Sequence, residues 1–149
     1  MTACMNVFLV FLWIYAAMIA TSFWEAYVEG KHPWDQGKLG WKLKFGNYTV
    51  LTAYHFFLFY LTFPLLLTLP FIVSGFNQVL LGILISAYAT GLIIEDFFWF
   101  IVNPTFHIKN WNPDHVHWYP WLKIGKAYIP VFYVVALLIS VGSWFFIWR

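Results

Sequence analysis

The sequence predicts an all-α integral membrane protein, a bundle of four transmembrane helices in one domain over residues 1–149, and three observations lead to this prediction. Only 9% of the 149 residues are charged, whereas a typical soluble domain carries about 25%. Hydrophobic residues make up 62% of the chain, and the mean hydropathy is +0.73. Asp, Glu, Lys and Arg are absent from residues 1–24, 45–94 and 127–148. This pattern excludes a soluble globular enzyme, a disordered chain and a disulfide-stapled scaffold.

The charge-free stretches set the expected membrane spans. A helix needs about 20 apolar residues to cross about 30 Å of hydrocarbon. The first and last stretches are each long enough for one span, and the middle stretch is long enough for two. We therefore expect helices over about residues 4–25, 47–72, 79–102 and 128–148.

Proline, glycine and asparagine indicate where these helices end or bend. The run from Ser74 to Gln78 contains glycine and asparagine and separates the second helix from the third. Pro64 and Pro70 should kink or shorten the second helix. Pro104 ends the third helix, and Pro130 suits the first turn of the fourth.

Lysine and arginine are unevenly distributed between the two sides of the predicted bundle. Seven lysines fall in the two long loops, and the other side carries only Arg149. Because cytoplasmic loops are enriched in Lys and Arg, we expect loops 26–46 and 103–127 to be cytoplasmic and both termini to lie outside.

Two similar segments suggest an internal duplication. Trp41–Tyr48 reads WKLKFGNY, Trp121–Tyr128 reads WLKIGKAY, and one gap aligns them. Each half also has a stripe of small residues that leads to a glutamate at four-residue spacing: Ala17, Thr21 and Glu25, then Ala87, Gly91 and Glu95. Such stripes let helices approach closely. Two duplicated helical hairpins are one interpretation, and chance similarity in an aromatic-rich chain is the other.

Three ionisable residues are expected deep inside the spans. Glu95 and Asp96 precede the expected end of the third helix by about two turns, and His55 follows the start of the second helix by as much, so all three lie roughly 10–12 Å below the same interface. Glu25 and Glu29, at the end of the first helix, are expected closer to water. Since ionisable residues within spans usually face the bundle interior and have a function, we predict a site formed by His55, Glu95 and Asp96.

A metal centre is one chemistry for this site, because imidazole and carboxylate suit Zn, Fe, Mn or Cu. The candidate ligands are His55, Glu95, Asp96, His107, Asp114, His115 and His117. In the segment DHVH the two imidazoles share one side of an extended chain, since side chains alternate there. Glu29 and His32 also show an E-x-x-H spacing, which matches the helices of di-iron proteins only weakly.

Metal-free acid–base chemistry is a second interpretation, with Glu95, Asp96 and His55 as the catalytic residues. Two adjacent carboxyls in a low dielectric do not both ionise easily, so one can stay protonated and act as a general acid. A structural interpretation also stands. In it, a Glu95–His55 pair fixes the helix register, and His115 and His117 contact headgroups or solvent.

The segment Gly91–Pro104, GLIIEDFFWFIVNP, resembles the acidic-pair motif of lycopene cyclase domains of the heterodimeric bacterial type and of their fungal and archaeal fusions. In that family an acidic pair follows proline and an aliphatic residue and precedes a run of Phe and Leu; here Ile93 and Ile94 precede the pair. Those proteins are small, helical and multi-spanning, and their cyclisation is redox-neutral and acid-initiated. The resemblance implies that Glu95 and Asp96 take the role of the family's acidic pair.

These patterns favour a small membrane enzyme or metal-site protein that acts on a lipid or isoprenoid near the cytoplasmic leaflet. Aromatic residues, 24% of the chain, would line its cavity. The alternatives are a metal-free isomerase or cyclase, and a non-catalytic accessory subunit of a larger membrane complex. Membrane lipids are the expected partners, together with other membrane subunits or a second copy of the chain. A net charge of +2 argues against nucleic acid.

Overall fold

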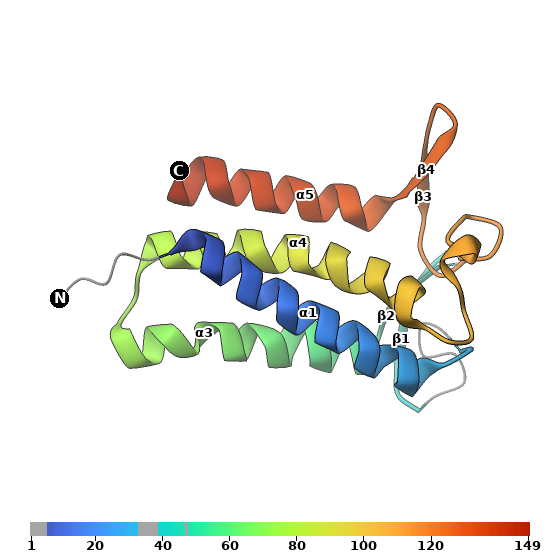
Figure 1. Ribbon diagram of the computed structural model, residues 1–149, viewed down its shortest axis with the longest axis horizontal. Coiled ribbons are helices and arrows are strands. Elements are labelled where there is room, and N and C mark those ends of the chain that lie inside the picture. Colours follow the sequence, from blue (N-terminus) through green and yellow to red (C-terminus); the bar gives the residue numbers. More distant parts are fainter. Residues whose placement is uncertain (1–5, 33–38, 47) are drawn as a thin grey trace.

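Figure 1 shows the computed structural model of the protein, which describes residues 6–32, 39–46 and 48–149. Three predicted features lie outside these ranges: the start of the first helix at residue 4, the start of the second helix at residue 47, and residues 33–38 of the first loop. The described chain is mostly helical and contains four helices that are long and apolar enough to cross a membrane: Val7–Glu29, Ala53–Ser74, Gln78–Val102 and Val131–Trp148. The prediction of four helices of membrane-spanning length is therefore confirmed.

Two of the four spans are continuous α-helices and two contain π-helical turns. The continuous ones are α1 (Val7–Glu29) and α4 (Gln78–Val102). The second span runs through α2 (Ala53–His55), π-helical η1 (Phe56–Thr62) and α3 (Phe63–Ser74). The fourth runs through α5 (Val131–Ser143) and π-helical η3 (Trp144–Trp148), and a short 3₁₀ helix, η2 (Ile108–Asn110), follows α4.

The boundaries of α4 follow the predicted signals. α3 ends at Ser74, and Gly75 adopts a positive φ of 83°, a conformation in which glycine is not strained. The Asn77 side chain then accepts a hydrogen bond from the Leu80 N–H at 2.9 Å and caps α4. Helix α4 ends at Val102, two residues before Pro104.

Two β-hairpins correct the prediction that the chain is wholly helical. β1 (Lys42–Phe45) pairs with β2 (Tyr48–Thr52), and β3 (Trp121–Ile124) pairs with β4 (Ala127–Pro130), both antiparallel. The helices expected from residues 47 and 128 thus begin later, and Pro130 is the residue before the first turn of α5 rather than part of it. Aromatic and β-branched residues favour these strands, and Gly46 (φ 58°) and Gly125 (φ 62°) supply the backbone of tight hairpin turns.

The hairpins occupy equivalent places in the two halves of the chain, each just before the second helix of its half (Figure 1). They also coincide with the two similar sequence segments, Trp41–Tyr48 and Trp121–Tyr128. This agreement supports the duplication, which stays a prediction.

The second span contains two prolines, and its π-helical segment η1 accommodates the first of them, Pro64. The Phe63 N–H donates to the Leu58 carbonyl, five residues earlier, so the helix is wound wide just before the proline. Pro64 has no N–H to continue this pattern onto the Phe59 carbonyl. The Tyr88 hydroxyl of α4 donates to that carbonyl at 2.5 Å. The acceptor left by the proline therefore ties the second span to α4.

Helix α4 lies at the centre of the bundle, between α5 and α3, and α1 crosses it (Figure 1). Close approach of α1 is possible because Gly91 has no side chain: a Cβ there would lie 3.0 Å from Met18 Cγ. The Ser22 hydroxyl of α1 donates to the Glu95 carbonyl of α4 at 2.7 Å. The crossing thus fixes the glutamate of α4 beside the last turns of α1.

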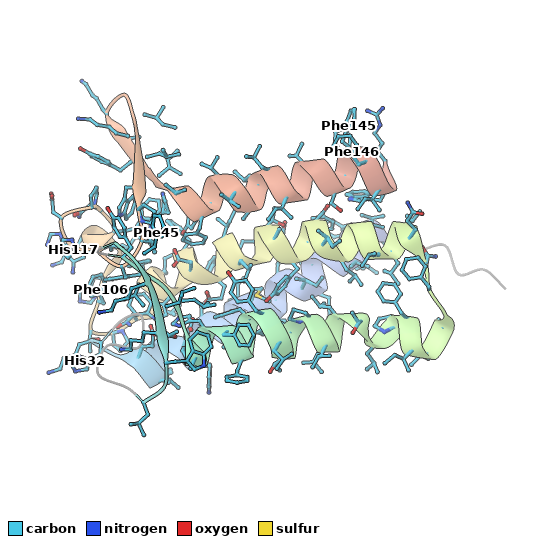
Figure 2. The ribbon with its side chains drawn as sticks, turned by 180° about the vertical axis from the view of Figure 1, so that it is seen from behind. His32, Phe45, Phe106, His117, Phe145 and Phe146 are labelled. Carbon is cyan, nitrogen blue, oxygen red and sulfur yellow. The ribbon has the colours of Figure 1, made fainter. Side chains whose placement is uncertain are left out.

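The outer surface of the bundle is apolar. Trp13, Ile72 and Phe146 are each 80% exposed, and no residue of α3 is buried (Figure 2). Contiguous apolar surface of this kind is rare on soluble monomers and suits contact with lipid. Both hairpins and the loop after α4 lie at one end of the bundle, and the C-terminal end of α5 lies at the other (Figure 1). Which end is cytoplasmic stays a prediction.

Candidate metal centre

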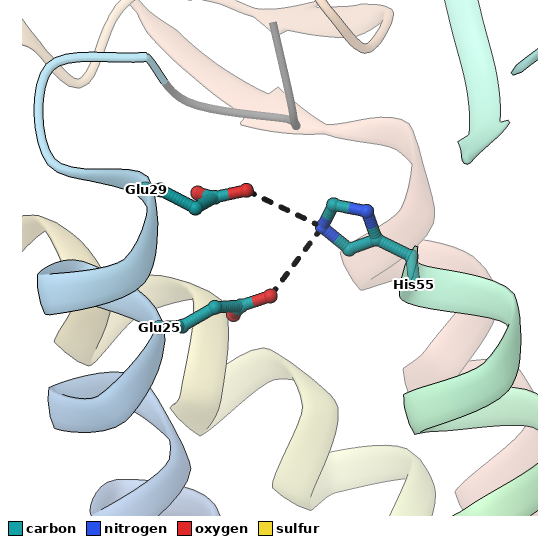
Figure 3. A group of neighbouring side chains, drawn as sticks. All are labelled: Glu25, Glu29 and His55. Carbon is teal, nitrogen blue, oxygen red and sulfur yellow. Dashed lines mark ion pairs between the residues drawn. The ribbon is translucent and has the colours of Figure 1, made fainter. Parts of the chain in front are cut away.

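The last two turns of α1 and the start of the second span bring two glutamates and a histidine together (Figure 3). Glu25 and Glu29 are one helical turn apart and share a face of α1. His55 Nε2 lies 3.4 Å from Glu25 Oε1 and 3.8 Å from Glu29 Oε1. All three residues are buried, with exposed fractions of 3% for Glu25, 6% for Glu29 and 4% for His55. One imidazole therefore faces two buried carboxylates.

Thr52, the last residue of β2, orients this imidazole. Its Oγ1 caps the helix by accepting from the His55 backbone N–H at 3.3 Å, and it lies 2.6 Å from His55 Nδ1. With the Nδ1–H donated to Thr52, the lone pair of Nε2 points at the carboxylates. Metal-binding histidines are commonly held in this way by a partner on the other ring nitrogen. The hairpin that the sequence did not predict thus places the residue that orients His55.

The spacing of the three ligand atoms fits one metal ion. In a tetrahedral site with bonds of about 2.1 Å, neighbouring ligand atoms lie about 3.4 Å apart. The two measured N–O distances are 3.4 and 3.8 Å, and all three ligand atoms lie within 4.8 Å of one another. Small side-chain movements would bring all three into contact with one ion. Glu25, Glu29 and His55 can therefore hold a metal ion.

Replacing Thr52 by valine is expected to weaken metal binding about 10- to 100-fold, the usual effect of losing such a partner. Valine keeps the shape of threonine and removes the hydroxyl that holds Nδ1 and caps the helix. The measurement is the metal affinity of the purified variant by competition with a chelator of known affinity. Thr68→Val serves as the control, because the Thr68 hydroxyl donates to the Leu65 carbonyl in lipid-exposed α3. Equal affinities of the two variants would contradict the orienting role of Thr52.

A cavity of about 130 Å³ adjoins the three ligands. Glu95 lies on its wall, 6% exposed, with its carboxyl close to that of Glu25. Asp96 also lines the cavity, and no Lys or Arg lies among the described residues that do so. Four carboxyls and one imidazole thus line the same cavity. Phenylalanine, tryptophan and leucine side chains form most of the remaining wall.

Asp96 is held by two tyrosines rather than by His55. Its Oδ2 accepts hydrogen bonds from the Tyr133 hydroxyl at 2.7 Å and the Tyr119 hydroxyl at 3.4 Å. Burial, together with the nearby Asp96 carboxylate, raises the pKa of Tyr119 well above its ordinary value. Tyr119 therefore remains protonated and acts as a donor. The structure separates the adjacent acids, with Glu95 beside Glu25 and Asp96 at the tyrosines.

The loop after α4 closes this end of the bundle without bringing its own charged residues to the site. Val116 and Trp118 are buried against α4, and the Trp118 ring stacks on Phe100 with a centroid distance of 6.4 Å. The predicted loop ligands all lie exposed on the outer side: His107, Asp114, His115 and His117 (Figure 2 for His117). His115 Nδ1 contacts Asn112 Oδ1 at 2.9 Å.

Of the predicted site residues, the structure gathers His55, Glu95 and Asp96 around the cavity. It also adds Glu25 and Glu29, which were expected nearer to water and are instead buried. The E-x-x-H spacing does not form a site, because His32 is exposed at the loop end (Figure 2). The signal for the missed pair was present in the sequence: the stripe of small residues on the first helix leads to Glu25, and Glu29 continues it by one turn.

Comparison of the chain with family models, curated proteins and solved structures found no match. The resemblance of Gly91–Pro104 to the lycopene cyclase motif stays a prediction.

Proposed function

We propose that this chain is a metal-dependent integral membrane enzyme that acts on an apolar substrate. Glu25, Glu29 and His55 bind a divalent Zn, Fe or Mn ion in the membrane-spanning bundle. Glu95 faces the same space from α4, as a further ligand or as a base beside the metal. The lysine bias of the sequence supports a cytoplasmic position for the hairpin end, and so for the site near it.

One observation carries this proposal: a buried imidazole faces two buried carboxylates, with a third carboxyl, that of Glu95, close by. Burying several like charges is costly unless protons or a cation compensate them. Among the described residues that line the cavity there is no Lys or Arg to do so. A bound divalent cation compensates the carboxylates and binds neutral His55 through Nε2, the ring nitrogen that faces them.

The ligand set also suits catalysis rather than a purely structural metal. Structural zinc sites are usually closed by four protein ligands, whereas catalytic sites keep a position open. Two glutamates and one histidine leave such a position, and the cavity adjoins it. A metal ion there can polarise a substrate oxygen or lower the pKa of bound water.

Elemental analysis of the untagged, detergent-purified protein tests the proposal. Near-stoichiometric Zn, Fe or Mn is expected. After chelation and dialysis, readdition of the native metal at about 100 times its Kd should stabilise the protein by about 2.7 kcal/mol. A metal content no higher than the buffer blank, with no stabilisation by any of the three ions, would overturn the proposal. It would leave an ion pair of protonated His55 with Glu25 and Glu29.

A further inference from the structure

Two side-chain atoms on the cavity wall lack hydrogen-bond partners among the described residues. Glu95 Oε1 is a buried acceptor and Trp99 Nε1 is a buried donor, and the two residues are 6% and 5% exposed. They lie one turn apart on α4, where side chains are neighbours about 5–6 Å apart. A buried polar group without a partner is costly, so this pair indicates a ligand group that both donates and accepts.

The charge of the cavity restricts that group further. Glu25, Glu29, Glu95 and Asp96 surround the space, so even one divalent ion leaves it negative unless protons are added. An anionic headgroup such as a carboxylate or phosphate would be repelled. A neutral hydroxyl can donate to Glu95 and accept from Trp99, and it satisfies both atoms.

The position of the cavity indicates how an apolar molecule reaches it. Tyr60 of the second span, 62% exposed, and Phe132 of the fourth span both line the cavity. These spans flank α4 on opposite sides, and Leu92 of α4 forms part of the wall (Figures 1 and 2). The opening therefore faces lipid. A cavity of about 130 Å³ is close to the roughly 150 Å³ that holds one benzene, so a long chain would remain partly in the bilayer.

We propose that the substrate is a neutral long-chain alcohol that enters from the bilayer between the second and fourth spans and places its hydroxyl between Glu95 and Trp99. This inference rests on the proposed function, because it names the substrate class of that same site. Trp99 is a binding residue for the hydroxyl, and Tyr60 and Phe132 contact the chain.

Photolabelling in phosphatidylcholine nanodiscs tests the inference. The probes are diazirine derivatives of dodecanol, its methyl ether, dodecanoate and dodecane. Labelling of the peptides that contain Tyr60 or Phe132 is divided by labelling of lipid-exposed Ile72 and Val73, which corrects for partition into the bilayer. We expect corrected labelling by dodecanol to exceed that by dodecane about two- to tenfold. Labelling by the methyl ether should be intermediate, because the ether lacks the hydrogen-bond donor. Labelling by dodecanoate should be the lowest.

Trp99→Phe keeps an aromatic ring and removes the N–H, so it should reduce labelling by the ether to nearly that of dodecane. Labelling by dodecanol should fall to an intermediate level, because its hydroxyl still donates to Glu95. Trp144→Phe is the matched control, since Trp144 is a lipid-exposed residue of η3 outside the cavity wall, and it should preserve the order of the probes. Equal labelling by dodecanol and dodecane would overturn the inference and indicate that water bridges Glu95 and Trp99. A preference for dodecanol that is undiminished in Trp99→Phe would also overturn it.

The metal content of the same samples separates this inference from the proposed function. Wild-type protein that contains metal but shows no preference for dodecanol contradicts only the substrate class. Wild-type protein without metal that still prefers dodecanol contradicts the metal centre and leaves the alcohol site standing, because hydrogen bonds from the hydroxyl to Glu95 and from Trp99 to the hydroxyl do not require a bound ion.

Discussion

Replacing His55 by alanine is expected to lower metal affinity by more than about 100-fold, because the loss of an outer-shell partner alone costs about 10- to 100-fold. His55 supplies the only nitrogen of the ligand group, and its Nε2 faces both Glu25 and Glu29. Without it, the two buried carboxylates of α1 lose the ligand that faces them. Metal content after purification and chelator competition measure the effect.

The matched control removes histidines that the sequence also marked as ligands. His115→Ala combined with His117→Ala deletes two imidazoles from the exposed surface of the loop after α4. We expect this double variant to keep the metal of the wild-type protein. If it loses the metal while His55→Ala retains it, the site lies in the loop and the assignment to Glu25, Glu29 and His55 is wrong.

Glu25→Gln and Glu29→Gln distinguish a metal centre from an ion pair. In a metal centre each change removes an anionic ligand, so both variants lose affinity for the ion. In an ion pair without metal, His55→Ala would leave the buried carboxylates uncompensated and cost about 3–5 kcal/mol of stability, and metal content would be unchanged in every variant. Stability and metal content measured together therefore identify the interaction.

Hydropathy was sufficient to predict the spans but not the hairpins. The four charge-free helices follow from the need for about 20 apolar residues per crossing. The strands β2 and β4 are also uncharged, so hydropathy alone does not distinguish them from the apolar helices that follow them. Gly46 and Gly125, each between short runs of aromatic and β-branched residues, were the available sign of a tight turn.

The candidate site was predictable only in part. The position of a residue along a span gives its depth in the membrane, whereas contacts between residues of different helices depend on the folded structure. The position of His55 within an apolar span indicated a functional residue. Glu25 and Glu29 lie near the end of α1, where the sequence alone predicts that side chains are exposed to water. Their burial depends on tertiary contacts: Asn103, the C-cap residue of α4, donates from Nδ2 to the Gly30 carbonyl at 2.9 Å and fixes the end of α1.

Gly82→Val is expected to destabilise the bundle by about 3 kcal/mol or more, at or above the upper end of the usual cost of overpacking. Gly82 lies where the end of the fourth span packs on α4. A Cβ there would lie 2.7 Å from Ile147 Cγ2 and 2.8 Å from Trp148 Cδ1. The Ser143 hydroxyl donates to the Gly82 carbonyl at 2.9 Å, and Trp148 Nε1 donates to Ser86 Oγ at 2.8 Å. Moving the helices apart to accommodate valine would break these bonds as well.

Gly142→Val provides the matched control, because a Cβ at Gly142 of α5 has no heavy atom within 4 Å. Both changes introduce the same β-branched side chain into a helix, so intrinsic helix propensity contributes equally to the stability change in the two variants. Titration with SDS from mixed micelles, followed by circular dichroism, measures the difference. Equal stabilities would show that the end of the fourth span does not pack on α4 as described. Since the three metal ligands lie on α1 and α2, folded Gly82→Val protein should still bind metal.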